Sequence, residues 1–187
     1  MRIIAGSLKG RAIRTPEGAN TRPTSDRARE SLFNVLAHAD WAPGLEGLRV
    51  IDAFAGSGAL GFEAISRGAA FCLFVETEAT ARGCIRDNVE AFQLFGNTRI
   101  HRRSATDLGP KPAGLGNPFD LVFMDPPYRQ GLVPLALEQL ASGQWLTPDA
   151  LIVAETGSDE PAAQAEGWTT VDERLYGAAR VSFLRRA

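Results

Sequence analysis

The chain has 187 residues, of which 44% are apolar and 22% are charged, and its formal net charge is −2. This composition indicates one globular domain that can bury its own core, and it excludes intrinsic disorder and an apolar membrane span of about 18 residues. The first residues lack the apolar stretch of a secretion signal, so we expect a cytoplasmic protein. With two cysteines and two histidines, no structural zinc site and no other metal is expected.

Charge is distributed unevenly along the chain. Residues 1–30 carry seven basic and three acidic side chains, whereas the other 157 residues carry thirteen basic and nineteen acidic ones. A basic segment on an acidic body favours a polyanionic partner such as nucleic acid. A solvated basic surface gives the same composition, so charge alone leaves both interpretations open.

The N-terminal part predicts a hairpin followed by a helix. Apolar residues on both sides of the turn sequence GSLKG indicate a small β-hairpin over residues 3–13. A stretch rich in proline and glycine follows, and Thr24 or Ser25 can then cap a helix over about residues 26–39.

From residue 48 onward, short apolar runs alternate with helical patterns. The pattern predicts strands near 48–54, 71–76, 98–101, 119–125 and 150–155, helices near 59–67, 78–95, 131–142 and 158–165, and two alternating strands at 168–176 and 179–184. Continuous apolar strands between helices are typical of a parallel sheet covered on both faces, and the last two strands indicate an antiparallel hairpin at one edge. Ligands of such sheets bind beyond the carboxyl ends of the strands.

A glycine-rich turn follows the first predicted strand. The segment from Asp52 to Gly61 reads DAFAGSGALG, and its glycines allow a tight turn and close approach of a ligand to the backbone. Glu76 ends the next strand, twenty residues after Gly56, where its carboxylate can accept hydrogen bonds from ribose hydroxyls. This pattern fits NAD as well as S-adenosylmethionine, and a plain strand-to-helix turn would also use glycines.

The fourth predicted strand ends in Asp125-Pro126-Pro127-Tyr128. The two prolines remove backbone donors and hold the preceding residues extended, so the Asp125 carboxylate and the Pro126 carbonyl are available as acceptors. Tyr128 adds an aromatic face, on which a nucleobase stacks with about 1–3 kcal/mol. Such a site suits an exocyclic amino group on a flat base, while a rigid turn without function is the alternative.

Together these segments resemble the bacterial S-adenosylmethionine-dependent guanine-N2 methyltransferases that modify 16S ribosomal RNA. The resemblance covers nearly the whole chain and is carried by MRIIAGSLKGR at 1–11, RPTSDRARESLFN at 22–34, DAFAGSGALGFEAISRGA at 52–69, FVE at 74–76 and DPPY at 125–128. It implies a Rossmann-like α/β methyltransferase fold, with a mostly parallel seven-stranded sheet, helices on both faces, a C-terminal antiparallel hairpin and an N-terminal β-hairpin extension.

The resemblance also implies a partner and a division of the chain. The implied partner is 16S rRNA or the assembling small ribosomal subunit, met by a monomeric enzyme that needs no membrane and no metal. Residues 1–30 would form an RNA-contacting arm, and residues 31–187 would form the methyltransferase domain.

Individual roles follow from the same resemblance. The residues implied to hold the target amine and base are Asp125, Pro126, Pro127 and Tyr128. The implied S-adenosylmethionine contacts are Asp52, Ala55, Gly56, Ser57, Gly58, Glu76, Thr106 and Asp107. Of these, Glu76 would bind the ribose and Asp107 the adenine amino group, near Ala105. The implied RNA contacts are Lys9, Arg11, Arg22, Arg27 and Arg29, although Asp26 and Glu30 could instead brace these arginines.

Three other functions fit parts of the pattern. A DNA adenine-N6 methyltransferase, or another nucleic-acid amino-methyltransferase, would use the same chemistry on a different base. An NAD-dependent oxidoreductase fits the glycine turn and Glu76, but it leaves the Asp125–Tyr128 segment unexplained. A non-catalytic nucleic-acid-binding module would not need the cofactor motifs.

Overall fold

The structure, a computed structural model, describes residues 1–18 and 26–187. Its helices are α1 (Asp26–His38), α2 (Ala59–Ser66), α3 (Ala79–Phe92) and α4 (Leu132–Ser142), with a 3-10 turn η1 at Ala113–Leu115. Its strands are β1 (Arg49–Ala53), β2 (Phe71–Val75), β3 (Thr98–His101), β4 (Phe119–Met124), β5 (Leu146–Gly157), β6 (Trp168–Tyr176) and β7 (Ala179–Arg186). In these two ranges, no helix has the length and apolar character needed to cross a bilayer.

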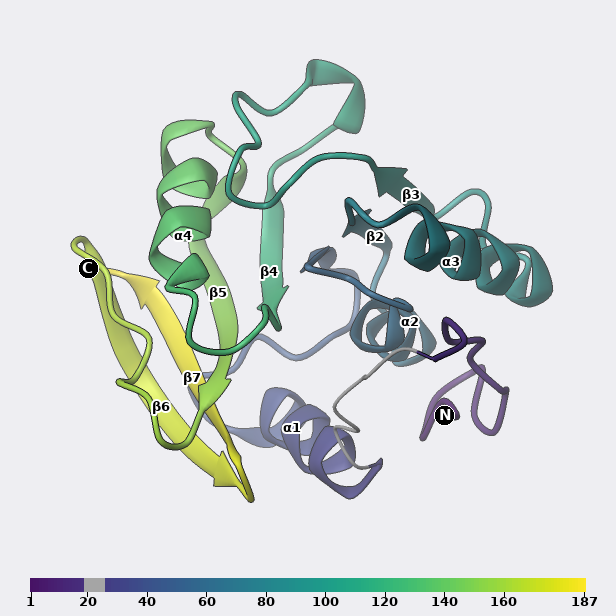
Figure 1. The fold of residues 1–187 in the computed structure, drawn as a ribbon, viewed down its shortest axis with the longest axis horizontal. Coiled ribbons are helices and arrows are strands. Elements are labelled where there is room, and N and C mark those ends of the chain that lie inside the picture. The colour runs from purple at the N-terminus through teal and green to yellow at the C-terminus, as the bar shows by residue number, and fades with distance from the viewer. Residues whose placement is uncertain (19–25) are drawn as a thin grey trace.

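All seven strands form one sheet in the order β3-β2-β1-β4-β5-β7-β6 (Figure 1). Strands β1 to β5 are parallel, and Ala53 of β1 lies opposite both Val75 of β2 and Met124 of β4. Strand β7 runs antiparallel between β5 and β6, so the C-terminal hairpin forms one edge of the sheet, as predicted. The chain order reverses between β1 and β4, which is the point where such sheets bind ligands.

Helices cover both faces of the sheet, as predicted. One buried layer joins Phe33 of α1, Phe62 of α2 and Phe92 of α3 to side chains of the strands. The opposite layer joins α4, through Leu137, to Trp145 and the alternate strand residues. Because burying one large apolar side chain contributes about 1.5–3 kcal/mol, these two layers hold the strand ends in a fixed arrangement.

The N-terminal segment packs against the sheet domain. The predicted hairpin is present in its shortest form, as one antiparallel bridge between Arg2 and Ala12. Ile3 and Ile13 are buried in the layer that contains α1, α2 and α3. Figure 1 shows this purple segment beside α2 and α3.

A buried carboxylate fastens this segment to α2. Glu63 has no exposed side-chain surface, and it accepts hydrogen bonds from the Ile4 and Ala5 N–H groups at 2.9 and 3.2 Å. The same carboxylate pairs with Arg67 at 2.9 Å and with Arg29 at 3.5 Å. Two cations and two backbone donors therefore surround one buried anion, which is how a buried charge is tolerated.

Residues 158–165 form a loop, so the helix predicted there is wrong. Pro161 lacks an amide hydrogen and disfavours the helical conformation at Glu160. The Glu160 carboxylate instead accepts hydrogen bonds from the backbone N–H of Gly157 at 2.9 Å and of Arg129 at 3.2 Å. The helix predicted over 78–95 is present as α3 but ends earlier, because Gln93 adopts a left-handed conformation with φ of 57°.

Candidate active site

The carboxyl ends of β1, β2 and β4 bring the predicted acidic residues to one edge of the sheet. Glu76 follows β2 and Asp125 follows β4, and both line a cavity of about 400 Å³. Phe54, the first residue of the glycine turn after β1, lines the same cavity. Within residues 1–18 and 26–187, no three His, Cys, Asp or Glu side chains are grouped to hold a metal ion.

Glu76 connects the end of β2 to the glycine turn. Its Oε1 accepts a hydrogen bond from the Gly56 N–H at 2.7 Å, and its Oε2 accepts one from the Glu78 N–H at 2.8 Å. A carboxylate has about four acceptor positions, so each oxygen can accept a further hydroxyl donor while it holds the backbone. The sequence predicts Glu76 as a ligand contact, and the structure adds its role in fixing the turn.

Asp52 supports the glycine turn from the interior. Its side chain is 2% exposed, and Oδ2 accepts a hydrogen bond from the Gly61 N–H at 3.0 Å. Burial raises the pKa of Asp52 well above its usual range, the carboxylates of Asp125 and Glu76 raise it further, and the bond from Gly61 opposes them. Asp52 does not belong to the cavity lining, so its direct effect is on the shape of the turn.

The glycine turn combines backbone strain with close packing. Phe54 has a φ of 57°, a left-handed conformation that non-glycine residues rarely adopt and that occurs at functional sites. A Cβ at Gly61 would lie 2.5 Å from the Phe74 ring and 2.6 Å from Cys72 Sγ, so only glycine lets α2 approach β2 this closely. Ala55, Gly56, Ser57 and Gly58 form the turn, with Gly56 also left-handed at φ 58°. None of these four residues belongs to the cavity lining, so their cofactor contacts stay predictions.

The loop after β3 forms another wall of the 400 Å³ cavity. Arg103, Ser104 and Ala105 line it, and sequence reasoning missed the first two. The Thr106 hydroxyl contacts the Ser104 hydroxyl at 2.8 Å, whereas the Asp107 side chain is 84% exposed. Neither Thr106 nor Asp107 belongs to the cavity lining, so their cofactor contacts stay predictions.

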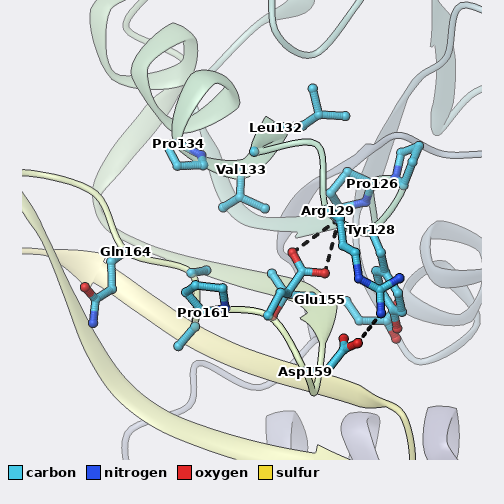
Figure 2. A pocket seen from close by; sticks show the side chains of 16 residues that line it. Pro126, Tyr128, Arg129, Leu132, Val133, Pro134, Glu155, Asp159, Pro161 and Gln164 are labelled. Atoms are coloured by element: carbon cyan, nitrogen blue, oxygen red, sulfur yellow. Dashed lines mark hydrogen bonds and ion pairs between the residues drawn. The ribbon is translucent and has the colours of Figure 1, made fainter.

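A second cavity has a volume of about 610 Å³, and Figure 2 shows the side chains that line it. Its walls include Pro126, Pro127 and Tyr128, the start of α4 and residues 159–164. Pro127 and Leu132 line both cavities, which places the proline-containing segment at their junction. Asp125 lines the first cavity and Tyr128 the second, so this short segment contributes residues to both cavities.

Arg129, which follows Tyr128, contacts the loop after β5 (Figure 2). Its backbone N–H donates to the two Glu160 carboxylate oxygens at 3.2 and 3.4 Å, and its guanidinium pairs with Asp159. The hydrogen bond from Arg129 lowers the pKa of the Asp159 carboxyl below its usual value. No local sequence pattern indicates this contact, because its partners lie about thirty residues apart.

Arg29 is wrongly predicted as a phosphate contact. Its side chain is 1% exposed and pairs with Glu63 at 3.5 Å and with Asp26 at 3.3 Å. A guanidinium enclosed in this way cannot meet an RNA phosphate at the surface. The alternative that acidic neighbours brace the arginines holds for Arg29 and Asp26.

The other predicted RNA contacts differ in their surroundings. Lys9, Arg11 and Arg27 are exposed. Arg11 also donates a hydrogen bond to the Ala91 carbonyl of α3 at 2.8 Å, so its position is fixed. Arg22 lies outside the residues that the structure describes. The RNA role of these four side chains stays a prediction.

The sheet topology and the strand-end residues define a Rossmann-like α/β methyltransferase. A solved structure named "Putative methyltransferase yhhF" from Escherichia coli matches with a TM-score of 0.82 and 33% identity, over 100% of this chain and 97% of that one. A magnesium protoporphyrin IX methyltransferase from Synechocystis, solved with bound SAM, shares the fold at a TM-score of 0.61 and 17% identity, over 86% of this chain and 79% of that one. The class supports S-adenosylmethionine as the cofactor, and the Glu76 carboxylate in the 400 Å³ cavity can accept hydrogen bonds from ribose hydroxyls.

The sequence comparisons then give the particular family. This chain belongs to the family described as "Conserved hypothetical protein 95", whose model matches residues 1–185. A relative from Haemophilus influenzae, named "Ribosomal RNA small subunit methyltransferase D", is 36% identical over 178 residues, which are 95% of this chain and 89% of the relative. The resemblance to methyltransferases of small-subunit rRNA is thereby confirmed.

Proposed function

We propose that this chain transfers a methyl group from S-adenosylmethionine to the exocyclic N2 amine of a specific guanine in 16S rRNA. The observation that carries the proposal is the common cavity of Glu76 and Asp125, which follow the strands on either side of β1. The name of the Haemophilus influenzae relative supports the substrate class. The proposed enzyme is a cytoplasmic monomer that meets 16S rRNA or the assembling small subunit, with residues 1–30 as RNA arm and 31–187 as methyltransferase domain.

The proposed cofactor subsite lies between the glycine turn and the loop after β3. When bound, S-adenosylmethionine supplies an electrophilic methyl group on a sulfonium. The Glu76 carboxylate accepts hydrogen bonds from the ribose hydroxyls while it still accepts the hydrogen bond from the Gly56 N–H. Backbone groups of residues 55–58 contact the amino-acid part, which Asp52 reaches through water. Thr106 and Asp107 lie toward the adenine, beside the buried Ala105.

The proposed amine subsite uses the acceptors of the proline-containing segment. The Asp125 carboxylate and the Pro126 carbonyl accept hydrogen bonds from the two N–H groups of the guanine amine. These bonds favour a pyramidal nitrogen, whose lone pair is localised and can attack the methyl group. The new N–C bond forms as the methyl–sulfur bond breaks, and the methylated amine then releases its proton to water. Asp125 acts through positioning and electrostatic preorganisation, and Tyr128 stacks on the base.

The target base must be unpaired or turned out of its helix to stack on Tyr128. Lys9, Arg11, Arg22 and Arg27 then contact the RNA backbone. If about four phosphates are engaged, the logarithm of the binding constant falls with the logarithm of salt concentration at a slope near −3. An affinity that does not change with salt would contradict these contacts.

The experiment that tests the function identifies the product. Small-subunit RNA and small-subunit particles from a strain lacking the enzyme are incubated with the chain and methyl-labelled S-adenosylmethionine, and the nucleosides are then separated. We expect labelled N2-methylguanosine. Labelled N6-methyladenosine, from RNA or from a DNA substrate, would favour the methyltransferase of a different base, and no labelled nucleoside from any substrate would refute the proposal.

A further inference from the structure

Arg129 lies beside the ring on which the target base is proposed to stack. It directly follows Tyr128, and both residues line the 610 Å³ cavity. A Cβ placed on Gly157 would lie 3.3 Å from Tyr128 Cδ2 and 2.9 Å from carboxylate oxygens of Asp159 and Glu160. The tyrosine ring and the two acidic partners of Arg129 therefore meet around one backbone position at the end of β5.

The backbone part of this contact is well anchored. The Glu160 carboxylate accepts the N–H groups of Arg129 and of Gly157, at 3.2 and 2.9 Å. Arg180 of β7 donates to the Glu160 carbonyl at 3.0 Å, which ties the same residue to the sheet. These bonds fix where the Arg129 side chain leaves the main chain, with φ at 62°.

The side-chain part is exposed and can be exchanged. The ion pair joins the Arg129 guanidinium to the Asp159 carboxylate, and the two side chains are 65% and 60% exposed. Ion pairs at this exposure contribute little to stability, because water and salt screen them. A second anion can therefore replace Asp159 without disturbing the bonds that hold the backbone.

We propose that Arg129 binds a phosphate of the target nucleotide, and that Asp159 holds this guanidinium until RNA displaces it; the inference rests on the proposed function. A base stacked on Tyr128 brings its own phosphate to within one sugar of the ring. Among the described residues that line the two cavities, Arg103 and Arg129 carry positive charge, and Arg103 belongs to the cofactor side. A planar guanidinium matches phosphate oxygens with two parallel hydrogen bonds.

The acidic surroundings explain why the exchange involves Asp159. Glu155, Asp159 and Glu160 all line the 610 Å³ cavity, so their charges oppose an entering phosphate. Glu160 is committed to backbone donors, whereas Asp159 pairs with the arginine side chain. When the Arg129 guanidinium turns to the phosphate, its positive charge offsets the repulsion from the acidic side chains. The exposed Asp159 carboxylate is then solvated by water. The ion pair thus competes with RNA and lowers its affinity.

The two partners of the ion pair should have opposite effects on RNA binding. We expect Arg129→Ala to weaken the affinity for small-subunit RNA about tenfold and to reduce the salt slope by about 0.7. Asp159→Asn should strengthen the affinity about two- to fivefold, because it removes a competitor of modest strength. Both are measured by RNA titration without cofactor and by the KM for RNA, and the affinity for S-adenosylmethionine should stay unchanged.

A matched control uses an ion pair far along the chain. Arg174 and Asp172 of β6 pair at 2.9 Å on the edge strand, and Arg174→Ala should leave RNA affinity unchanged. An equal loss in Arg174→Ala would overturn the inference, because it would reduce Arg129 to general surface charge. A loss in Asp159→Asn comparable to that in Arg129→Ala would also overturn it, since the ion pair would then serve only to build the cavity wall.

These outcomes are distinct from failure of the proposed function. Wild-type chain that methylates no rRNA refutes the function itself. Wild-type methylation of rRNA combined with weakened RNA binding in Asp159→Asn refutes only the role of Arg129.

Discussion

The two cavities that meet at the proline-containing segment are held in different ways. On the proposed cofactor side, the buried Asp52 binds the Gly61 N–H in the first turn of α2, and the half-buried Glu76 binds the Gly56 N–H of the glycine turn. On the amine side, the outer wall is a loop whose side-chain contact to Arg129 is largely exposed. The difference indicates that buried contacts preorganise the proposed cofactor subsite, whereas a solvent-screened ion pair holds the outer wall of the proposed substrate subsite.

The largest expected effect is on the rate of methyl transfer and comes from Asp125, at the start of the proline-containing segment where the two cavities meet. Asp125→Ala should reduce the rate of methyl transfer at least about 100-fold, because the amine loses its charged acceptor, while the affinity for S-adenosylmethionine is retained. Single-turnover transfer and calorimetric titration measure the two quantities. Asp120→Asn, at the amino end of the same strand, is the control for stability. Wild-type turnover in Asp125→Ala would remove this residue from the mechanism. Loss of S-adenosylmethionine binding in this variant would contradict the assignment of cofactor binding and amine positioning to separate subsites.

The close packing of α2 against β2 on the proposed cofactor side is tested next, by adding one methyl group at Gly61. Gly61→Ala should destabilise the fold by about 1–3 kcal/mol, because the new Cβ would lie 2.5 Å from the Phe74 ring. Urea unfolding measures the loss. Gly96→Ala is the matched control, since a Cβ there meets nothing within 4 Å. If both variants unfold at the same urea concentration, the turn is less tightly packed than the structure indicates.

Removing the carboxylate that holds the turn should weaken the cofactor. Glu76→Ala is expected to lower the affinity for S-adenosylmethionine about tenfold or more, because a charged acceptor of the ribose and the anchor of Gly56 are both lost. Glu78→Ala is the matched control, since Glu78 lines the same cavity without a side-chain bond to the turn. Unchanged affinity by calorimetry in Glu76→Ala would exclude its ribose role.

The buried carboxyl gives a pH dependence with a defined sign. Because burial raises the pKa of Asp52 in the folded state, the folded chain retains a proton that the unfolded chain has lost in the pH range between the two pKa values. The contribution of Asp52 to stability is therefore present at low pH and is lost as pH rises toward the folded pKa. We expect Asp52→Asn to gain stability relative to wild type with increasing pH, measured by urea unfolding across the acidic to neutral range. A difference that shrinks with pH would mean that Asp52 is ionised in the fold.

The smallest expected effect is on thermal stability and comes from the exposed ion pair between Arg129 and Asp159. Asp159→Asn should leave the melting temperature within about 2 °C of wild type, because its partner is solvated and the Glu160 bonds remain. Differential scanning calorimetry measures this. A drop as large as that of Gly61→Ala would show that both cavities depend equally on packing, and the contrast between them would disappear.

The parts that the sequence predicts well are those decided by local pattern. Phe119–Met124 is a continuous apolar run, which is typical of a parallel strand with both faces covered, and it forms β4 at the center of the sheet. Glu76 and Asp125 could be placed together because the ends of parallel strands lie at the same edge. Arg103 and Ser104 could not, because their position depends on the path of the loop after β3.

The errors come from partners that are distant in sequence. Arg29 has the composition of a surface cation, and its burial follows from Glu63 on another helix. Residues 158–165 have polar helical composition, but Pro161 disfavours a helix locally, and Glu160 is also held by an N–H group 31 residues earlier. In both cases a carboxylate forms a tertiary contact that local propensity does not contain.

The buried Glu63 has a practical consequence for dissecting the protein. Deleting residues 1–18 would remove the Ile4 and Ala5 donors and leave the buried carboxylate with fewer hydrogen bonds, and an unsatisfied buried acceptor costs about 1–3 kcal/mol, or more when it is charged. A shortened chain would therefore lose stability together with the proposed RNA contacts, and its inactivity would not distinguish the two causes. Point changes at solvent-facing positions such as Lys9, or fusions at the 43%-exposed Met1, leave the hydrogen bonds between Glu63 and the N-terminal backbone intact.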